Sequence, residues 1–113
     1  MRLVILESPF AGSGWWLLRK WRERQNVAYA LKCVRDSLLR NEAPIASHLV
    51  YPRVLDDTIP EERQHGIDAG LAWKAVAHAS VVYTDRGITR GMKYGIEAAK
   101  AAGIPVEYRS IAP

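Results

Sequence analysis

An uninterrupted apolar run at the start of the chain constrains the fold more than any other feature. Residues Arg2 to Leu6 read Arg-Leu-Val-Ile-Leu, and Pro9 follows three positions later. A strand with apolar residues at consecutive positions is buried on both faces, which is typical of a parallel sheet covered by helices. The run therefore predicts a central strand of an α/β domain.

Strand and helix patterns alternate along the rest of the chain. The further predicted strands are Ile45 to Tyr51, Ser80 to Thr84 and Pro105 to Arg109, and the predicted helices are Asn26 to about Asn41, Pro60 to about Ala77 and Thr89 to Ala102. Asn26 is a plausible cap of its helix, Pro52 ends the second strand, and Gly103 closes the last helix. Right-handed βαβ crossovers then give a four-stranded, mainly parallel sheet flanked by helices.

Length and composition favour one domain. The chain has 113 residues, of which 49% are hydrophobic and 25% charged, as in globular proteins. We expect a single domain over residues 1–113, with a tryptophan-rich insertion at about 13–24. Cys33 lies at helical spacing from Leu31 and Val34 and is expected to be a buried thiol. The sequence has no apolar run of about 20 residues and no signal-peptide pattern, so a cytoplasmic location is the expectation.

Ligands of parallel α/β sheets bind beyond the carboxyl ends of the strands. Glu7, Ser8, Pro9 and Phe10 follow the first strand directly, so a carboxylate and a hydroxyl enter the expected crevice and suit a ribose or an amide. In the alternative interpretation, Glu7 pairs with a nearby arginine and Ser8 only satisfies a turn.

The turn after the third strand is a second candidate. Asp85, Thr89, Arg90 and Gly91 surround the start of a helix, where free N–H groups and the helix dipole attract a phosphate or a carboxylate. In the competing interpretation, Asp85 or Thr89 merely caps the helix and Arg90 faces solvent.

The histidines and the glycine-rich segment are further candidates for a site. Ser47 and His48 alternate on the second predicted strand, so only one of them can face a given ligand. The three histidines have unrelated spacings and no cysteine partner, and we expect neither a metal site nor a cofactor. Gly12-Ser13-Gly14 lacks the third glycine and the downstream acidic residue of a dinucleotide loop.

Trp15, Trp16 and Trp21 form an apolar segment within an expected surface connection. We favour a subunit interface for them, ahead of a flap over the ligand and ahead of base stacking with single-stranded nucleic acid. The formal net charge of +4 is modest, and the basic run from Arg19 to Arg24 is better explained as a solvated face than as a nucleic-acid patch.

Four motifs carry a family resemblance over nearly the whole chain apart from residues 12–24. They are Glu7-Ser8-Pro9-Phe10-Ala11-Gly12, Asn26-Val27-Ala28-Tyr29-Ala30, Ala43-Pro44-Ile45-Ala46-Ser47-His48-Leu49, and the segment from Gly91 to Pro105-Val106. The chain thereby resembles the nucleoside 2-deoxyribosyltransferase-like proteins, in particular a small branch found in phages and bacteria. The resemblance implies a Rossmann-like fold, a nucleoside- or nucleotide-derived ligand, frequent oligomers, and Asn26 and His48 as further members of the ligand site.

The resemblance also reveals a departure from the family. The transferases carry a nucleophilic glutamate four residues after the glycine matched by Gly91, and this chain has Gly95 there. Glu97 lies about 200° further around the helix and is flanked by Lys93 and Lys100, as on a solvated face. Glu7 and Asp85 are the remaining carboxylates placed to attack a sugar, and the sequence itself assigns no catalytic residue.

Three functions of different classes therefore stay open. We favour a module that binds a nucleotide-derived small molecule, such as an ADP-ribose-like signal, without turnover. The first alternative is an enzyme that transfers or hydrolyses an N-glycosidic bond, and the second is a structural protein that assembles through its tryptophans.

Overall fold

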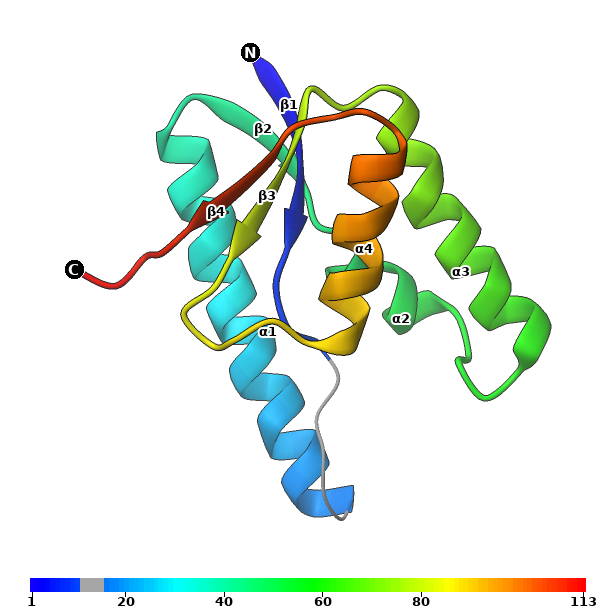
Figure 1. Cartoon of the computed structure of the whole chain (residues 1–113). Helices are drawn as coiled ribbons and strands as arrows, with labels where there is room; N and C mark the ends of the chain where they lie inside the picture. Colours follow the sequence, from blue (N-terminus) through cyan, green and yellow to red (C-terminus); the bar gives the residue numbers. More distant parts are fainter. Residues whose placement is uncertain (11–15) are drawn as a thin grey trace.

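Four parallel strands form one sheet in the order β2-β1-β3-β4. A computed structural model of the chain describes residues 1–10 and 16–113. The strands are β1 Arg2–Glu7, β2 Glu42–Ile45, β3 Ala79–Tyr83 and β4 Val106–Arg109. The predicted parallel α/β architecture is confirmed, with β1 inside the sheet between β2 and β3 (Figure 1).

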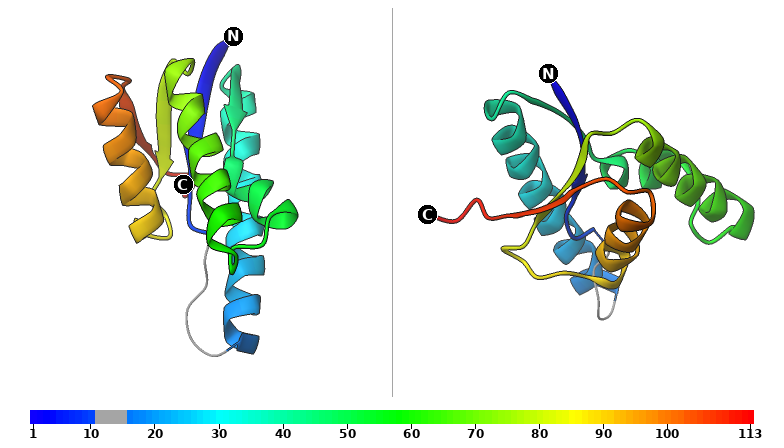
Figure 2. Two further views of the ribbon diagram at one scale, coloured as in Figure 1. Left: turned by 90° about the vertical axis from the view of Figure 1, so that its right-hand side faces the viewer. Right: turned by 45° about the horizontal axis from the view of Figure 1, so that its top comes forward.

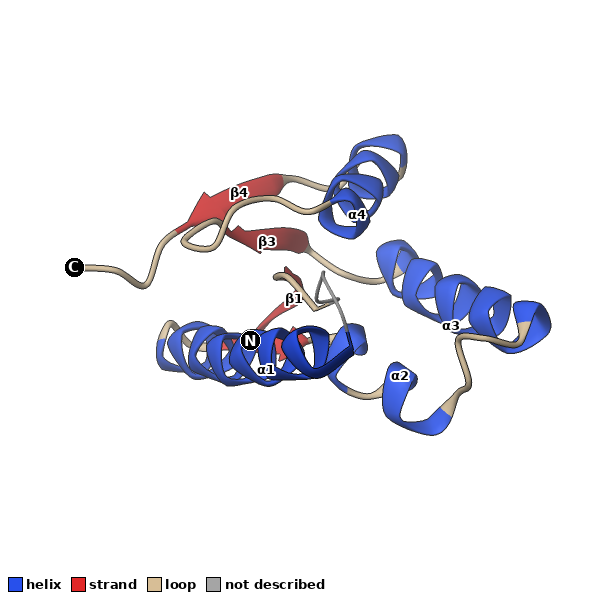
Figure 3. Ribbon diagram, turned by 90° about the horizontal axis from the view of Figure 1, so that it is seen from below, coloured by secondary structure: helices blue, strands red, loops and turns tan. Residues whose placement is uncertain are grey.

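Helices cover both faces of this sheet. They are α1 Trp16–Leu39, α2 Tyr51–Val54, α3 Pro60–Ala72 and α4 Arg90–Ala101, with short 3₁₀ segments η1 Ser47–Leu49 and η2 Trp73–Ala75. Helix α1 lies on one side of the strands, and α3 and α4 lie on the other (Figures 2 and 3). None of the helices in the described part of the chain is long and apolar enough to cross a membrane.

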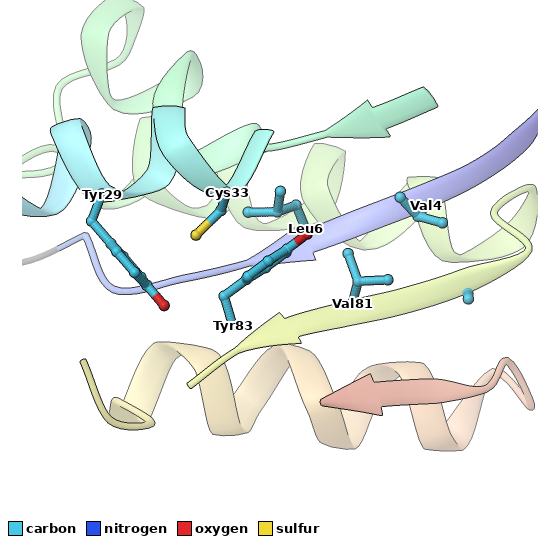
Figure 4. Packing of buried hydrophobic residues seen from close by; sticks show 7 residues of the cluster. Val4, Leu6, Tyr29, Cys33, Val81 and Tyr83 are labelled. Atoms are coloured by element: carbon cyan, nitrogen blue, oxygen red, sulfur yellow. The ribbon is translucent and has the colours of Figure 1, made fainter. Parts of the chain in front are cut away.

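The core consists of two clusters because alternate residues of each strand point to opposite faces. On the α1 side, Tyr29 and Cys33 pack with Val4, Leu6 and Tyr83 (Figure 4). On the opposite side, Val82 of β3 packs against Met92 and Ile96 of α4. Cys33 is a free, fully buried thiol, as expected. Because Val4 and Leu6 face α1, the alternate residues Ile5 and Glu7 project toward the α4 side.

The prediction of the second strand was wrong. A strand from Ile45 to Tyr51 was expected, but the strand β2 covers Glu42–Ile45. Ser47 and His48 belong to η1. Pro44 lies inside β2, opposite Val4 of β1. An edge strand tolerates proline because one side of it needs no N–H donor. Pro52 does not end a strand, and lies instead in the first turn of α2.

The first helix also differs from its prediction, since it begins at Trp16 and not at Asn26. The residues from Leu17 to Gln25 include many good helix formers and neither glycine nor proline, so the helix includes Trp16 and Trp21. Asn26 is a buried residue inside this helix and does not cap it. The helix ends at Leu39, close to the predicted stop, and Asn41 adopts a left-handed conformation with φ 65°.

A buried ion-pair network ties the two edge strands together on the α1 side. Arg109 of β4 donates from both terminal nitrogens to the two carboxylate oxygens of Glu42 of β2, at 2.7 Å each. The Ser37 hydroxyl donates to the same carboxylate at 2.9 Å. The exposed fractions of the Glu42 and Arg109 side chains are only 5% and 7%. Hydrogen bonding from Arg109 is the largest effect that lowers the pKa of Glu42, to about 2.

Candidate active site

Glu7 is the last residue of β1, so its carboxylate emerges at the carboxyl edge of the sheet on the side that α4 covers. The facing residue of α4 is Gly95, which is buried. A Cβ atom added at Gly95 would lie 2.5 Å from Oε1, 2.8 Å from Cδ and 2.9 Å from Oε2 of Glu7. The Glu7 carboxylate therefore occupies the space that a side chain at position 95 would need.

Lys74, in η2, is the charged partner of this carboxylate. Its Nζ atom lies 3.4 Å from Oε1 of Glu7, and the exposed fractions of the two side chains are 8% for Lys74 and 16% for Glu7. Burial raises the pKa of Glu7, and the nearby Lys74 ammonium partly offsets that increase. The alternative interpretation paired Glu7 with an arginine; the structure pairs it with a cation, and that cation is Lys74.

Ser8 and His48 form a second polar pair next to Glu7. The Ser8 Oγ and the His48 Nε2 atoms are 2.7 Å apart, and Ser8 is buried. Burial lowers the pKa of His48 to about 4, so the imidazole is neutral at physiological pH. A neutral imidazole can fix the Ser8 hydroxyl by a hydrogen bond but is a poor proton donor near neutrality.

Asn26 links the turn after β1 to the turn after β3. Its Nδ2 donates to the Phe10 carbonyl at 3.2 Å, and its Oδ1 accepts from Arg86 Nε at 3.1 Å. Pro9, which precedes Phe10 in this turn, is buried. Asn26 therefore braces the backbone that carries Glu7 and Ser8.

Asp85 has a structural task on the α1 side. Its carboxylate accepts hydrogen bonds from the Tyr29 hydroxyl, the Ser110 hydroxyl and the backbone N–H groups of Ile111 and Ala112. Desolvation alone would raise the pKa of Asp85, but these four donors together hold it well below its usual range. Asp85 thus fastens the C-terminal segment to α1.

Thr89 caps the start of α4, as the competing interpretation of this turn expected. Its Oγ1 accepts from the Met92 N–H at 3.3 Å. Arg90 is exposed, and a Cβ added at Gly91 would meet nothing within 4 Å. Arg90 and Gly91 therefore border open space, and the predicted anion site there stays a prediction.

The structure thus pairs Glu7 with Lys74 and Ser8 with His48, whereas Asp85 bonds to Tyr29 and to the C-terminal segment. A shallow cavity of about 410 Å³ lies beside Tyr29, Asp85 and Arg86, and Glu7 is not among its lining residues. No cluster of three or more potential metal ligands occurs among residues 1–10 and 16–113. Glu97 is exposed on α4 with Lys100 at 4.0 Å, as its spacing predicted.

Sequence reasoning missed Lys74 as a member of the site. The available signal is a lone lysine in the apolar stretch Ala72-Trp73-Lys74-Ala75-Val76. Such a lysine needs a buried partner, and a strand-end glutamate is the obvious one. Of the tryptophans expected at an interface, Trp16 and Trp21 are exposed on α1, whereas Trp15 lies outside the described residues.

Comparisons with known proteins agree with this fold. A family model described as "Domain of unknown function (DUF7768)" matches residues 2–109. A solved 2-deoxyribosyltransferase from the psychrotolerant bacterium Bacillus psychrosaccharolyticus superposes with a TM-score of 0.66 at 17% sequence identity, over 96% of this chain and 72% of that one. No curated protein sequence matches. The likeness to the transferase establishes a 2-deoxyribosyltransferase-like fold.

Proposed function

The chain belongs to the DUF7768 family, and we propose that this member binds a nucleoside-type ligand at the carboxyl edge of its sheet and breaks the N-glycosidic bond. One observation carries the proposal: the Glu7 carboxylate fills the space above Gly95. The family resemblance puts the attacking glutamate at position 95. A carboxylate from β1 thus lies where the missing side chain would reach.

The chemistry assigned to Glu7 is nucleophilic. One carboxylate oxygen attacks the anomeric carbon of the sugar, the carbon–nitrogen bond to the base breaks, and the base leaves with that electron pair and takes up a proton from water. Water or a second base then attacks the same carbon and gives up a proton to solvent, the ester bond to Glu7 breaks, and the carboxylate is restored. Lys74 holds the carboxylate in place between these steps, and His48 orients the hydroxyl of Ser8, the residue that follows Glu7 in the chain.

A second candidate is capture of a nucleotide-derived molecule, such as an ADP-ribose-like signal, without turnover. The ion pair between Glu7 and Lys74 favours it, because a paired and largely buried carboxylate is a weaker nucleophile than a free one. Ser8, Asn26, Arg90 and Gly91 serve as proposed ligand contacts under both candidates. The phage and bacterial branch of the resemblance also stays a proposal.

One experiment separates the two candidates. The protein is incubated with a panel of nucleosides, nucleotides and NAD-derived compounds, and both bound and released molecules are identified by mass spectrometry. Catalytic appearance of free base, lost in Glu7→Gln, supports the enzyme. Intact ligand recovered from denatured protein, with no free base at any enzyme concentration, supports the binder.

Glu97→Gln is the matched control, because this glutamate on α4 is exposed and pairs with Lys100, not with Lys74. The variant is expected to keep both binding and turnover. If Glu97→Gln abolishes release of the base while Glu7→Gln does not, the assignment of Glu7 is wrong.

A further inference from the structure

The first turns of α1 carry an exposed surface that combines aromatic and basic side chains. We call it the basic aromatic patch, and it consists of Trp16, Leu17, Arg19, Lys20, Trp21 and Arg24. The exposed fractions of Trp16 and Trp21 are 58% and 55%. Lys20 Nζ lies 5.8 Å from the ring centroid of Trp16, so a cation and an aromatic face are presented together. Exposed apolar groups of this size indicate an interaction surface.

The end of α2, the start of α3 and the connection between them carry the complementary chemistry. We call this surface the acidic patch, and it consists of the exposed residues Val54, Asp56, Asp57, Ile59 and Glu61. No basic residue occurs between Arg53 and Arg63. A groove of about 470 Å³ lined by Asp57, Thr58, Pro60, Arg63, Gln64 and Ile67 adjoins these carboxylates. The patch thus offers negative charge, aliphatic surface and a hollow that can receive a side chain.

Both patches lie in the lower half of the molecule as Figure 1 shows it, with the first turns of α1 at the bottom and the connection between α2 and α3 at the right. No ion pair joins them in the part of the chain that the structure describes. Surfaces of opposite charge in one half of a molecule can meet across a two-fold axis, where each contact is made twice. In such a pair, every basic aromatic patch faces the acidic patch of the other copy.

We propose that two copies of this chain associate through this half, with the basic aromatic patch of each copy seated on the acidic patch of the other. Charge complementarity selects the second copy as the occupant, because the chain itself supplies both members of the contact. Trp21 and Trp16 supply the apolar centre, and the groove beside Asp57 receives one of them. Arg19, Lys20 and Arg24 form the charged rim against the partner's carboxylates.

The test is a pair of charge-reversed variants studied by sedimentation velocity at micromolar concentration. One variant is Lys20→Glu/Arg24→Glu, and the other is Asp57→Lys/Glu61→Lys. Each variant alone places like charges on both sides of the contact, so its dissociation constant should rise at least about tenfold relative to the wild type. An equimolar mixture restores opposite charges and should form a heterodimer.

Two further measurements sharpen the result. Trp21→Ala should weaken the dimer, whereas Tyr94→Ala should not, because Tyr94 is an equally exposed aromatic on α4 outside both patches. The wild-type dimer should also weaken as salt rises, since exposed charges are screened.

A wild-type monomer at these concentrations would overturn the proposal. So would variants that each remain dimeric, or a mixture that fails to associate although both folds are intact by circular dichroism. Binding of the monomer to phosphatidylserine vesicles or to single-stranded oligonucleotides, lost in Lys20→Glu/Arg24→Glu, would assign the basic aromatic patch to that other partner.

Discussion

Replacement of Gly95 by alanine tests the close approach on which the candidate site depends. The added Cβ would lie 2.5 Å from the nearest oxygen of Glu7, whereas ordinary van der Waals contact begins at 3.4 Å. The carboxylate must therefore move by about 1 Å, away from a position that burial and Lys74 hold. Overpacking of this kind costs about 1 to 3 kcal/mol, so Gly95→Ala should lower the free energy of unfolding by that amount.

The sign of the effect should reverse when Glu7 is truncated. In a Glu7→Ala background the contact disappears, and what remains is the preference of a helix interior for alanine over glycine, worth about 0.5 to 1 kcal/mol. Gly95→Ala should therefore stabilise the Glu7→Ala protein. The coupling energy between the two positions is then about 1.5 to 4 kcal/mol, well above the error of a double-mutant cycle.

Urea unfolding of the four proteins of this cycle measures the coupling, with the slope of each transition as a check on two-state behaviour. In a Glu7→Gln background the shape of the side chain is kept, so Gly95→Ala should still destabilise. Gly91→Ala is the control within α4, because a Cβ there meets nothing within 4 Å. If Gly95→Ala in the wild type is as benign as Gly91→Ala, Glu7 does not occupy the position described.

Three further predictions follow from the ionisable groups. Between pH 4.5 and about 2, where Glu42 is protonated more readily in the unfolded chain, its contribution to the free energy of unfolding should fall by about 3 kcal/mol in acid titrations; Glu42→Gln should remove this part of the pH dependence and leave the part that comes from Asp85. Asp85→Ala should release the C-terminal segment, seen as faster amide exchange at Ile111 while β3 stays protected; unchanged exchange at Ile111 would contradict that role. If Glu7 turns over a nucleoside, Lys74→Met should shift the acid limb of the activity profile to higher pH, because the lysine lowers the pKa of Glu7; a profile that does not move would separate Lys74 from the reaction.

Much of the architecture could be read from local patterns. The apolar run from Arg2 to Leu6 predicted a buried strand, and Pro60 and Thr89 marked helix starts close to the observed ones. Gly103 follows α4 with φ 77°, as a helix-terminating glycine should. These features depend on backbone sterics and on hydrogen bonds between near neighbours, so a short stretch of sequence contains the information for them.

The second strand could not be placed in this way, because its bounds depend on a distant partner. Residues 42–45 pair with residues 2–5 of β1, and the local sequence around Pro44 does not indicate an edge strand. Beyond Ile45 the chain leaves the sheet and forms η1 and α2. The intrinsic strand preference of Leu49, Val50 and Tyr51 was overridden by tertiary context.

The sequence by itself determined that a carboxylate would stand at the end of the first strand, and that position 95 would have no side chain. Only the tertiary structure decided that these two facts concern the same volume of space. Glu7, Lys74 and Gly95 lie on three different elements, and their contacts arise when η2 and α4 pack on the same face of the sheet. Packing between distant segments, which no local pattern encodes, therefore created the candidate site.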